Sequence, residues 1–337
     1  MKESRTPNRS HWSIFQPEKT QTRMVLKLNS SITSSWTSLN GHRSMKSSIK
    51  SNNFGNMEST HEIFQRSLFP CVVHDDRFII MTGGMEVKAK RVKSTVIYDS
   101  KLQSYTSLSG IPLEKSCGAA IIKEYLYVVS TDRICRLSLS FTSPWERLLF
   151  RDKCSAVNTV LSKDAFLYIF NINGTNEIYD TRRDKFLTMP KMNTPRLGFA
   201  SAIVDDKFYI IGGYDYSSFK MLCSVEVFNT STHSWSKATS LPQPLGSAAA
   251  AVTGTSIVVT GGEYDIYDLS PHTYIFDLNT QRWAQSYYQL SPPRKNHCCV
   301  TLGEQILTIG GRDKEDRFCS ADSVDCKYLV SSHVLRS

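Results

Sequence analysis

The sequence lacks several features that would assign it to a compartment or a membrane. No run approaches about 18 consecutive apolar residues, so no transmembrane helix is expected. Positions 1–24 contain no apolar stretch of the kind that a secretory signal needs. The nine cysteines are odd in number and include no Cys-x-x-Cys pair, which favours free thiols in a reducing compartment. We therefore expect a protein of the cytoplasm or the nucleus, without membrane attachment.

Motifs that carry chemistry are also scarce. The eight histidines form no His-x-His or His-x-x-x-His pair, and no carboxylate cluster has metal-ligand spacing. The string Gly-Gly-Tyr-Asp-Tyr is not followed by the Gly-Lys-Ser/Thr of a phosphate loop. His297 follows Pro293-Arg294 and precedes Cys298, a setting that favours a structural role over ligation. We expect no catalytic residue, no metal site and no cofactor.

The positive charge is concentrated at one end of the chain. The net charge is +9, and residues 1–60 carry nine Lys or Arg against three acids, which accounts for +6 of it. This region is rich in serine, so we interpret it as a solvated, partly disordered arm. The alternative is weak attraction to an anionic surface or nucleic acid, although a nucleic acid partner is not expected.

What the sequence does contain is a repeat. Four segments share one pattern, in which a small or apolar strand, a polar turn and a second apolar strand end in Gly-Gly; their final glycines are Gly84, Gly213, Gly262 and Gly311. The last three follow one another at a constant interval, and the longer interval between Gly84 and Gly213 has room for two more units. Segments 117–131 and 156–174 keep the rhythm of strand, turn and strand without the glycine pair. Six units result, at the spacing of a four-stranded propeller blade.

The second half of each unit carries a matching aromatic pattern. An aromatic followed by Asp or Asn stands seven residues before another aromatic, and turn-forming residues lie between them, which predicts a hairpin. Unit two keeps only Trp145. We expect these aromatics to be core residues; the pairs are Tyr98 and Tyr105, Tyr179 and Phe186, Phe228 and Trp235, and Phe276 and Trp283.

Gly-Gly after a second strand, an aromatic-acid pair and a later Trp together resemble the kelch motif. The resemblance covers roughly residues 63–330. Glycine suits the exit from the second strand because it adopts positive φ and lets another backbone approach closely. The resemblance implies an all-β fold, a six-bladed kelch-type β-propeller with four antiparallel strands per blade.

The sixth unit ends without an aromatic hairpin, so the ring needs another strand to close it. Residues 24–29 (Met-Val-Leu-Lys-Leu-Asn) and Trp36 resemble the back half of a blade, and an unclosed ring would leave an open sheet edge. Whether they supply one strand or two stays open, because 321–330 competes for the third position. The expected organisation is a disordered basic arm (1–22), closing strand or strands of the last blade (23–39), a flexible Ser/Asn/Lys-rich linker (40–62), the propeller (63–330) and a C-terminal tail (331–337).

The resemblance implies a non-catalytic protein-protein interaction module. Kelch propellers often recruit substrates for ubiquitin-ligase adaptors, joined to a BTB or F-box domain, and neither domain fits the segment 1–60 that precedes this propeller. The alternative is a kelch-fold enzyme, either a copper-radical oxidase similar to galactose oxidase or a sugar-processing enzyme. The Cys, Tyr and His ligands of such an oxidase cannot be placed on this sequence.

The loops between the second and third strands are the expected partner-binding surface. They carry Tyr, Phe and Arg, the residue types that dominate interaction hot spots, although ordinary variable loop surface is the alternative for any one residue. A partner segment that is acidic or anchored by an apolar side chain would suit them. The candidate residues are Tyr214, Tyr216, Phe219, Tyr264, Tyr267, Arg312, Arg317 and Phe318.

Overall fold

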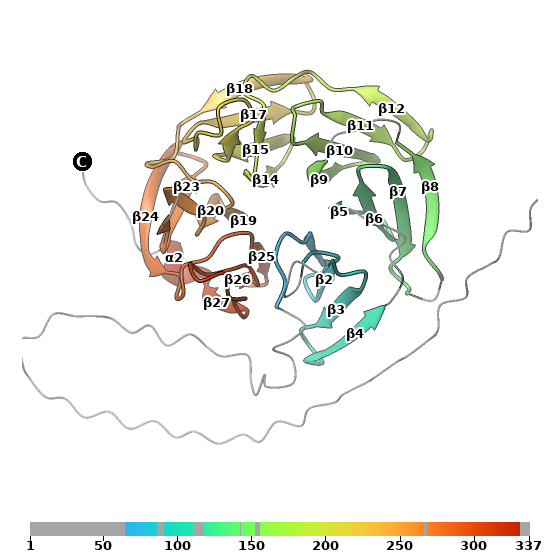
Figure 1. Ribbon diagram of the computed structural model, residues 1–337, viewed down its shortest axis with the longest axis horizontal. Helices are drawn as coiled ribbons and strands as arrows, with labels where there is room; N and C mark the ends of the chain where they lie inside the picture. Colours follow the sequence, from blue (N-terminus) through green and yellow to red (C-terminus); the bar gives the residue numbers. More distant parts are fainter. Residues whose placement is uncertain are drawn as a thin grey trace, which may run out of the picture.

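Six small antiparallel sheets surround a central axis in the computed structural model (Figure 1). The structure describes residues 65–85, 91–108, 110, 117–141, 143–151, 156–265 and 268–330. The predicted six-bladed β-propeller is therefore confirmed. The predicted arm, closing strand, linker and tail (1–22, 23–39, 40–62 and 331–337) lie outside the described residues.

The first three blades each have four strands in the order of the chain, from the channel outward. Blade one is β1 (Cys71–His74), β2 (Phe78–Thr82), β3 (Thr95–Asp99) and β4 (Ser104–Leu108). Blade two is β5 (Cys117–Ile122), β6 (Tyr125–Ser130), β7 (Arg133–Ser138) and β8 (Glu146–Phe150). Blade three is β9 (Val157–Lys163), β10 (Phe166–Asn171), β11 (Glu177–Asp180) and β12 (Lys185–Thr188).

Blades four and five add a short ribbon to the same plan. Blade four is β14 (Ala200–Val204), β15 (Lys207–Ile211), β17 (Val225–Asn229) and β18 (Ser234–Ala238), with the ribbon β13 (Arg196–Leu197) and β16 (Tyr214–Asp215). Blade five is β19 (Ala249–Thr253), β20 (Ser256–Thr260), β23 (His272–Asp277) and β24 (Arg282–Gln289), with the ribbon β21 (Glu263–Asp265) and β22 (Asp268–Leu269).

Blade six differs from the others. Its sheet is β25 (Cys298–Leu302), β26 (Gln305–Ile309) and β27 (Asp322–Asp325), after which the chain forms helix α2 (Cys326–Val330). Within the described residues this blade has three strands where four were expected. The third strand falls inside 321–330, the segment that competed for this place in the sequence.

The hydrophobic core is divided among the six interfaces between blades. Each of the six clusters of buried side chains draws its members from two neighbouring sheets. The cluster at the seam between the last and the first blade joins the two ends of the propeller sequence; its members include Ile79, Met81, Tyr98, Leu307 and Ile309. Burial of apolar surface therefore continues around the whole ring, across the seam as well as between consecutive blades.

The predicted hairpins form, and their aromatics face each other. Phe228 lies directly opposite Trp235 with ring centroids 5.1 Å apart, and the other three pairs have the same register. The indole Nε1 of Trp235 donates to the carbonyl of Pro190 at 2.9 Å, and Pro190 follows the outermost strand of the preceding blade. The aromatic hairpin thus connects neighbouring blades at the outer edge.

Candidate partner-binding face

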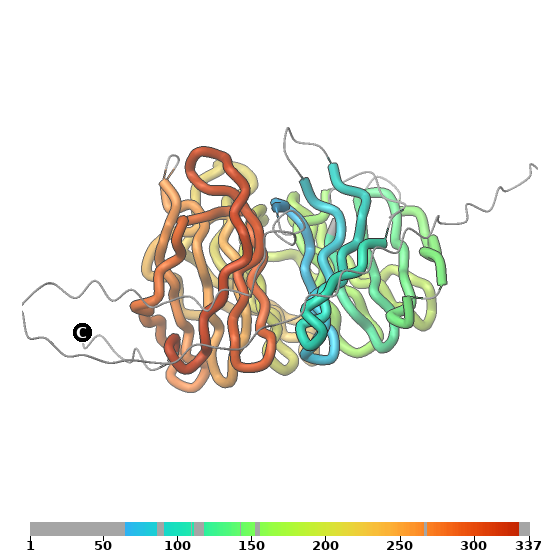
Figure 2. The backbone as a smooth tube through the Cα atoms, turned by 90° about the horizontal axis from the view of Figure 1, so that it is seen from below, coloured from blue at the N-terminus to red at the C-terminus, as the bar shows by residue number. Residues whose placement is uncertain are grey.

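The loops between second and third strands leave the ring at one end. In Figure 2 the β26–β27 loop, in red, and the β20–β23 loop, in orange, project from the upper end. In four blades the first loop residue pairs with the segment that leads into the innermost strand of the same blade: Met85 with Ser67, Tyr214 with Leu197, Glu263 with Gly246, and Arg312 with Lys295. These loops are therefore anchored near the channel instead of extending freely.

Glycine is required where blade four turns into its loop. Gly212 and Gly213 have φ of 61° and 92°, a region that disfavours side chains. A Cβ on Gly212 would overlap the carbonyl oxygen of Leu245, and one on Gly213 would lie 2.8 Å from that of Leu197. The glycine pair therefore lets the exit of the second strand pack directly against two backbone segments.

Side chains link the loops of blades four, five and six. The hydroxyl of Tyr214 donates to Oε2 of Glu263, and Lys295 Nζ lies 2.6 Å from Oε1 of the same carboxylate. Lys314, in the loop of blade six, pairs with Asp268 of blade five at 2.7 Å. The three loops therefore form one connected surface, which we call the loop face.

A belt of hydrogen bonds follows the channel rim at this end and links five of the six blades. The N–H of Leu68 donates to the carbonyl of Asn296 (3.1 Å), that of Asn296 to Ser247 (3.0 Å), and that of Ser247 to Gly198 (2.7 Å). Gly198 in turn donates to the side-chain oxygen of Asn158 at 2.7 Å. The first four residues all have φ between 54° and 59°. This repeated left-handed turn connects blades three to six and one, so the loop face has a rigid base.

Many of the side chains that line the channel inside the belt are small or apolar. The channel measures about 870 Å³ and is lined by the innermost strands, with Val72, Ala119, Ala120, Ala200, Ala249 and Ala251 among these side chains. Within the described part of the chain, no group of three or more His, Cys, Asp or Glu could hold a metal ion. The lining also includes His297 and the cysteines Cys71, Cys298 and Cys299.

His297 is held inside the protein. It is buried, and its Nε2 lies 3.0 Å from Oγ1 of Thr260 in the neighbouring blade. Burial, helped by the positive charge of Arg294, lowers the pKa of His297 to about 3. A neutral, enclosed imidazole that bridges two blades fits the structural role expected from the sequence.

Three of the candidate aromatics are open to solvent on the loop face. Tyr216 is 41% exposed, Phe219 is 68% exposed and Tyr264 is 43% exposed. Phe219 also has φ of 55°, an unusual conformation for a bulky residue. Phe219 lies in the turn that follows β16, and its N–H donates to the carbonyl of Asp215 at 2.8 Å. This turn keeps the ring of Phe219 exposed to solvent.

Other candidates are used within the protein. The ring of Tyr214 packs over Gly246, and burial together with the bond to Glu263 raises the pKa of its hydroxyl. The guanidinium of Arg312 lies 4.4 Å from the ring centroid of Phe318 and also pairs with Asp316. These three candidates organise the loops, so their own side chains are only partly available to a partner.

Two candidates remain, Arg317 and Tyr267. Arg317 is largely exposed, but it pairs with Asp313 at 2.7 Å and with Glu315 at 2.8 Å. Tyr267 lies outside the described residues. Partner binding by any of the eight candidates stays a prediction.

Sequence reasoning missed three buried arginines that hold the turns from which the loops begin. Arg66, Arg196 and Arg294 are almost fully buried just before three blades. Each donates to the carbonyl of the first glycine of a Gly-Gly pair and to a carbonyl shortly before the third strand. The available signal was the spacing, because Arg196 and Arg294 both follow proline and both stand at the same distance before the second glycine, Gly213 or Gly311.

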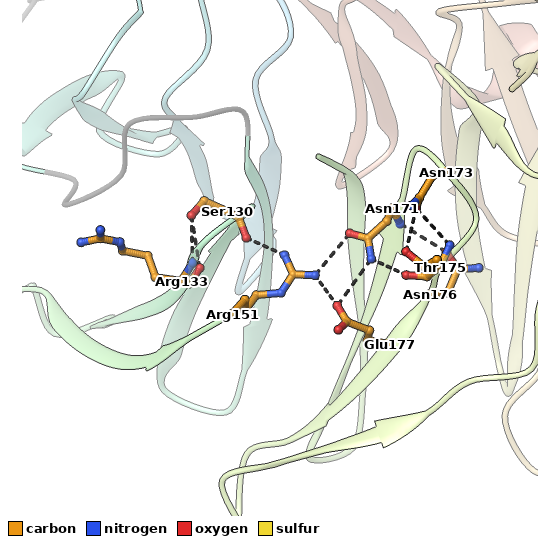
Figure 3. A network of polar contacts seen from close by, with 8 residues as sticks. All are labelled: Ser130, Arg133, Arg151, Asn171, Asn173, Thr175, Asn176 and Glu177. Carbon is orange, nitrogen blue, oxygen red and sulfur yellow. Dashed lines mark hydrogen bonds and ion pairs between the residues drawn. The ribbon is translucent and has the colours of Figure 1, made fainter. Parts of the chain in front are cut away.

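Blades two and three lack Gly-Gly but use a related arrangement (Figure 3). The buried guanidinium of Arg151 donates to the carbonyl of Ser130 at 2.5 Å and to Oδ1 of Asn171 at 3.3 Å, and it pairs with Glu177. Glu177 has the register in blade three that Glu226 has in blade four, where it pairs with Arg196. One arginine therefore joins the second-strand ends of both degenerate blades.

No helix among the residues that the structure describes is long and apolar enough to cross a membrane. This agrees with the absence of long apolar runs in the sequence.

Comparison with known proteins identifies the family. The family model described as the KLHDC2/KLHL20/DRC7 Kelch-repeats domain matches residues 157–333, slightly more than half of the chain. Kelch-like protein 21 of Mus musculus is 28% identical over 89 residues, and that of Homo sapiens is 27% identical over 101 residues. These matches cover 26% and 30% of this chain and 15% of each relative. With the repeat, the six blades and the family match in agreement, the chain belongs to the kelch-repeat domain family.

Proposed function

We propose that this chain is a non-catalytic protein-protein interaction module that binds a partner protein through the loop face. The observation that carries the proposal is the exposure of Tyr216, Phe219 and Tyr264 on loops that are braced against one another. Exposed aromatics on a rigid base are favourable anchors, because little conformational entropy is lost when they are buried. Membership of the kelch family supports a binding role.

The charges of the loop face favour an apolar anchor on the partner. Arg312, Lys314 and Arg317 each already pair with a carboxylate of this chain. An acidic partner segment would have to compete with these internal pairs, whereas an apolar side chain could pack on the open aromatic rings without breaking them. We therefore propose a partner segment whose main contact is apolar or aromatic, with acidic groups in a secondary role.

The cellular setting is part of the same proposal. A substrate-recruiting role in a ubiquitin-ligase complex is supported by the family and by the resemblance to Kelch-like protein 21. A cytoplasmic or nuclear location fits the free thiols, which include Cys135 and Cys299 in the core.

The test is quantitative affinity capture from cell extract with the full chain. The face variant combines Tyr216→Ser, Phe219→Asn and Tyr264→Ser, and asparagine is chosen because it tolerates the positive φ at 219. A rim variant, with Phe150→Ser and Tyr287→Ser, removes two aromatics of the outermost strands β8 and β24 that are 74% and 78% exposed, more than those of the loop face. We expect wild type and the rim variant to recover a common set of proteins. The face variant should recover at least about tenfold less of these proteins. Equal recovery by all three folded proteins would refute the loop face.

A further inference from the structure

Blade six and blade one are neighbours in the ring but stand at opposite ends of the propeller sequence (Figure 1). Consecutive blades share the backbone that leads from one to the next, whereas in the described residues this seam is closed by non-covalent contacts. They include the bond from the N–H of Gly311 to the carbonyl of Arg66 at 2.7 Å and the bond from Arg312 Nε to Ser67 Oγ at 3.2 Å. A covalent bond here would therefore join two blades that these contacts hold together.

The hydrogen-bond belt sets a common register for the innermost strands on the two sides of a seam. In each of two neighbouring seams, one small side chain stands two residues after the belt residue whose carbonyl accepts. A second stands three residues after the belt residue whose N–H donates, and both belong to the hydrophobic cluster of the seam. The pairs are Ala200 and Ala250 between blades four and five, and Ala249 and Cys299 between blades five and six.

Cysteine fills both places at the seam between blades six and one. Counted from Asn296, which accepts, and Leu68, which donates, these places are Cys298 and Cys71. Both are free thiols, and that of Cys298 lies 2.8 Å from the carbonyl oxygen of Phe69, just before β1. A side-chain hydrogen bond to Cys71, together with burial, raises the pKa of the Cys298 thiol well above its usual value. The two sulfur atoms are therefore direct neighbours across the seam.

The channel gives small molecules access to this pair. Cys71 and Cys298 both line the channel of about 870 Å³, which is far larger than a molecule of hydrogen peroxide, and both side chains are partly exposed. Cys299 lines the same channel but is almost fully buried, and its counterpart across the seam is Ala249. The arrangement therefore distinguishes one pair of thiols, at one seam.

We propose that Cys71 and Cys298 are a redox modification site, at which a hydroperoxide oxidises the two thiols to a disulfide that joins the first and last blades. Because Cys298 retains its proton, the sulfur of Cys71 reacts first. It attacks one oxygen of hydrogen peroxide, the O–O bond breaks, and a sulfenic acid and one water form. The sulfur of Cys298 then attacks the sulfenic sulfur, so that the S–S bond forms and the S–O bond breaks. The departing hydroxide takes the thiol proton and becomes the second water.

The disulfide closes a loop that contains almost the whole propeller. A cross-link over so long a loop restricts the unfolded chain strongly, and it also prevents the seam from opening in the folded protein. Arg312 of the loop face contacts Ser67 across the same seam, so the bond would hold this part of the loop face against blade one. A small-molecule thiol would reverse the link by thiol-disulfide exchange.

Peptide mapping by mass spectrometry tests the site on the full chain, treated with hydrogen peroxide and then alkylated at the remaining thiols. Wild type should yield a peptide in which Cys71 is linked to Cys298, and dithiothreitol should abolish it. Cys71→Ala and Cys298→Ala should yield no linked peptide, and both should fold, because Ala250 and Ala200 fill the equivalent places in blades five and four. Cys299→Ala is the matched control and should still form the link.

The rate of unfolding in urea tests the closure of the ring. Oxidised wild type should unfold at least about tenfold more slowly than the reduced protein. Dithiothreitol should restore the original rate, which separates the disulfide from methionine oxidation. Peroxide should not slow the unfolding of Cys71→Ala or Cys298→Ala.

Three outcomes would overturn the proposal. Wild type might yield no linked peptide, with Cys71 recovered as a thiol or as a sulfinic acid beside an alkylated Cys298. The linked peptide might instead join Cys71 to Cys299. Finally, an unchanged unfolding rate in the cross-linked protein would show that the bond does not hold the ring closed.

Discussion

Arg196 and Glu226 form a buried ion pair between the connection into blade four and the third strand of that blade. Nη2 of Arg196 lies 2.5 Å from Oε1 of Glu226, and the two side chains are 0% and 2% exposed. Arg196 also donates to the carbonyls of Gly212 and Ser224 at 3.0 and 2.9 Å, and Glu226 accepts the N–H of Asn193 at 2.8 Å. The pair therefore joins the connection into blade four to the glycine turn and to the third strand of that blade.

Replacing Arg196 by methionine should lower the free energy of unfolding by about 3–5 kcal/mol, because Glu226 would remain buried without its positive partner. Urea unfolding followed by fluorescence measures the loss. Arg282→Met, at an exposed side chain of β24, is the control and should change stability by less than about 0.5 kcal/mol. Adding Glu226→Leu to Arg196→Met should recover part of the loss. A loss below about 1 kcal/mol for Arg196→Met would contradict this role.

The blades could be predicted from sequence because their signals are local. Gly212-Gly213 and the spacing of Phe228 and Trp235 each act within one strand-turn-strand unit, so the pattern is visible along the chain. The role of Arg196 could not be read in the same way, since its partners lie 16 to 30 residues away. An arginine is usually a surface residue, and only the fold shows that this one is enclosed.

The candidate site was predicted less well than the fold. The sequence placed Tyr214 and Tyr216 in one loop, but it could not show that the first packs against the next blade and the second faces solvent. The pairing of Lys314 with Asp268 could not be predicted for the same reason, because it joins two residues of different loops that are 46 positions apart in the sequence. Contacts between blades decide which loop residues are free, and one repeat considered alone contains no information about its neighbour.

His297 should make stability depend on pH in the mildly acidic range. Its pKa is about 3 in the folded protein against about 6.5 when unfolded, so between these values the unfolded state binds the additional proton. Its contribution is therefore fully present above pH 6.5 and declines as the pH falls toward 3, by at most about 1.4 kcal/mol per pH unit. Comparing wild type with His297→Asn by urea unfolding between pH 7 and pH 4 isolates this effect from the carboxylates.

We expect the stability difference between wild type and His297→Asn to shrink as the pH falls, because only wild type loses this contribution. His233→Asn is the matched control, since His233 is exposed in a hairpin turn and has φ of 51°, which asparagine tolerates. A constant difference over the whole pH range would show that His297 does not titrate as described.

Purified protein should bind far less than one copper or zinc ion per chain and should not oxidise primary alcohols. The reason is that the residues which line the channel, although they include Cys71, His297, Cys298 and Cys299, contain no group of three or more His, Cys, Asp or Glu that could hold a metal ion in the described part of the chain. Elemental analysis after incubation with copper and extensive dialysis is the measurement. A content of about one copper per chain would instead favour the copper-radical oxidase alternative.

Glu263 should contribute to the stability of the loop face through a side chain that is only 16% exposed. Its carboxylate, in blade five, accepts from Tyr214 of blade four and pairs with Lys295 at the entry to blade six, so Glu263→Ala leaves two partly buried donors without an acceptor. We expect a loss of about 1–3 kcal/mol in the free energy of unfolding, and a smaller loss for Glu263→Gln, which still accepts from Tyr214. Glu315→Ala, at an exposed carboxylate that pairs with Arg317, should change stability by less than about 0.5 kcal/mol.

Because Glu263→Ala keeps Tyr216, Phe219 and Tyr264, weaker partner capture by this variant would show that the loops must be braced for those rings to bind. Unchanged stability in Glu263→Ala would mean that the three loops are positioned by their backbone contacts alone.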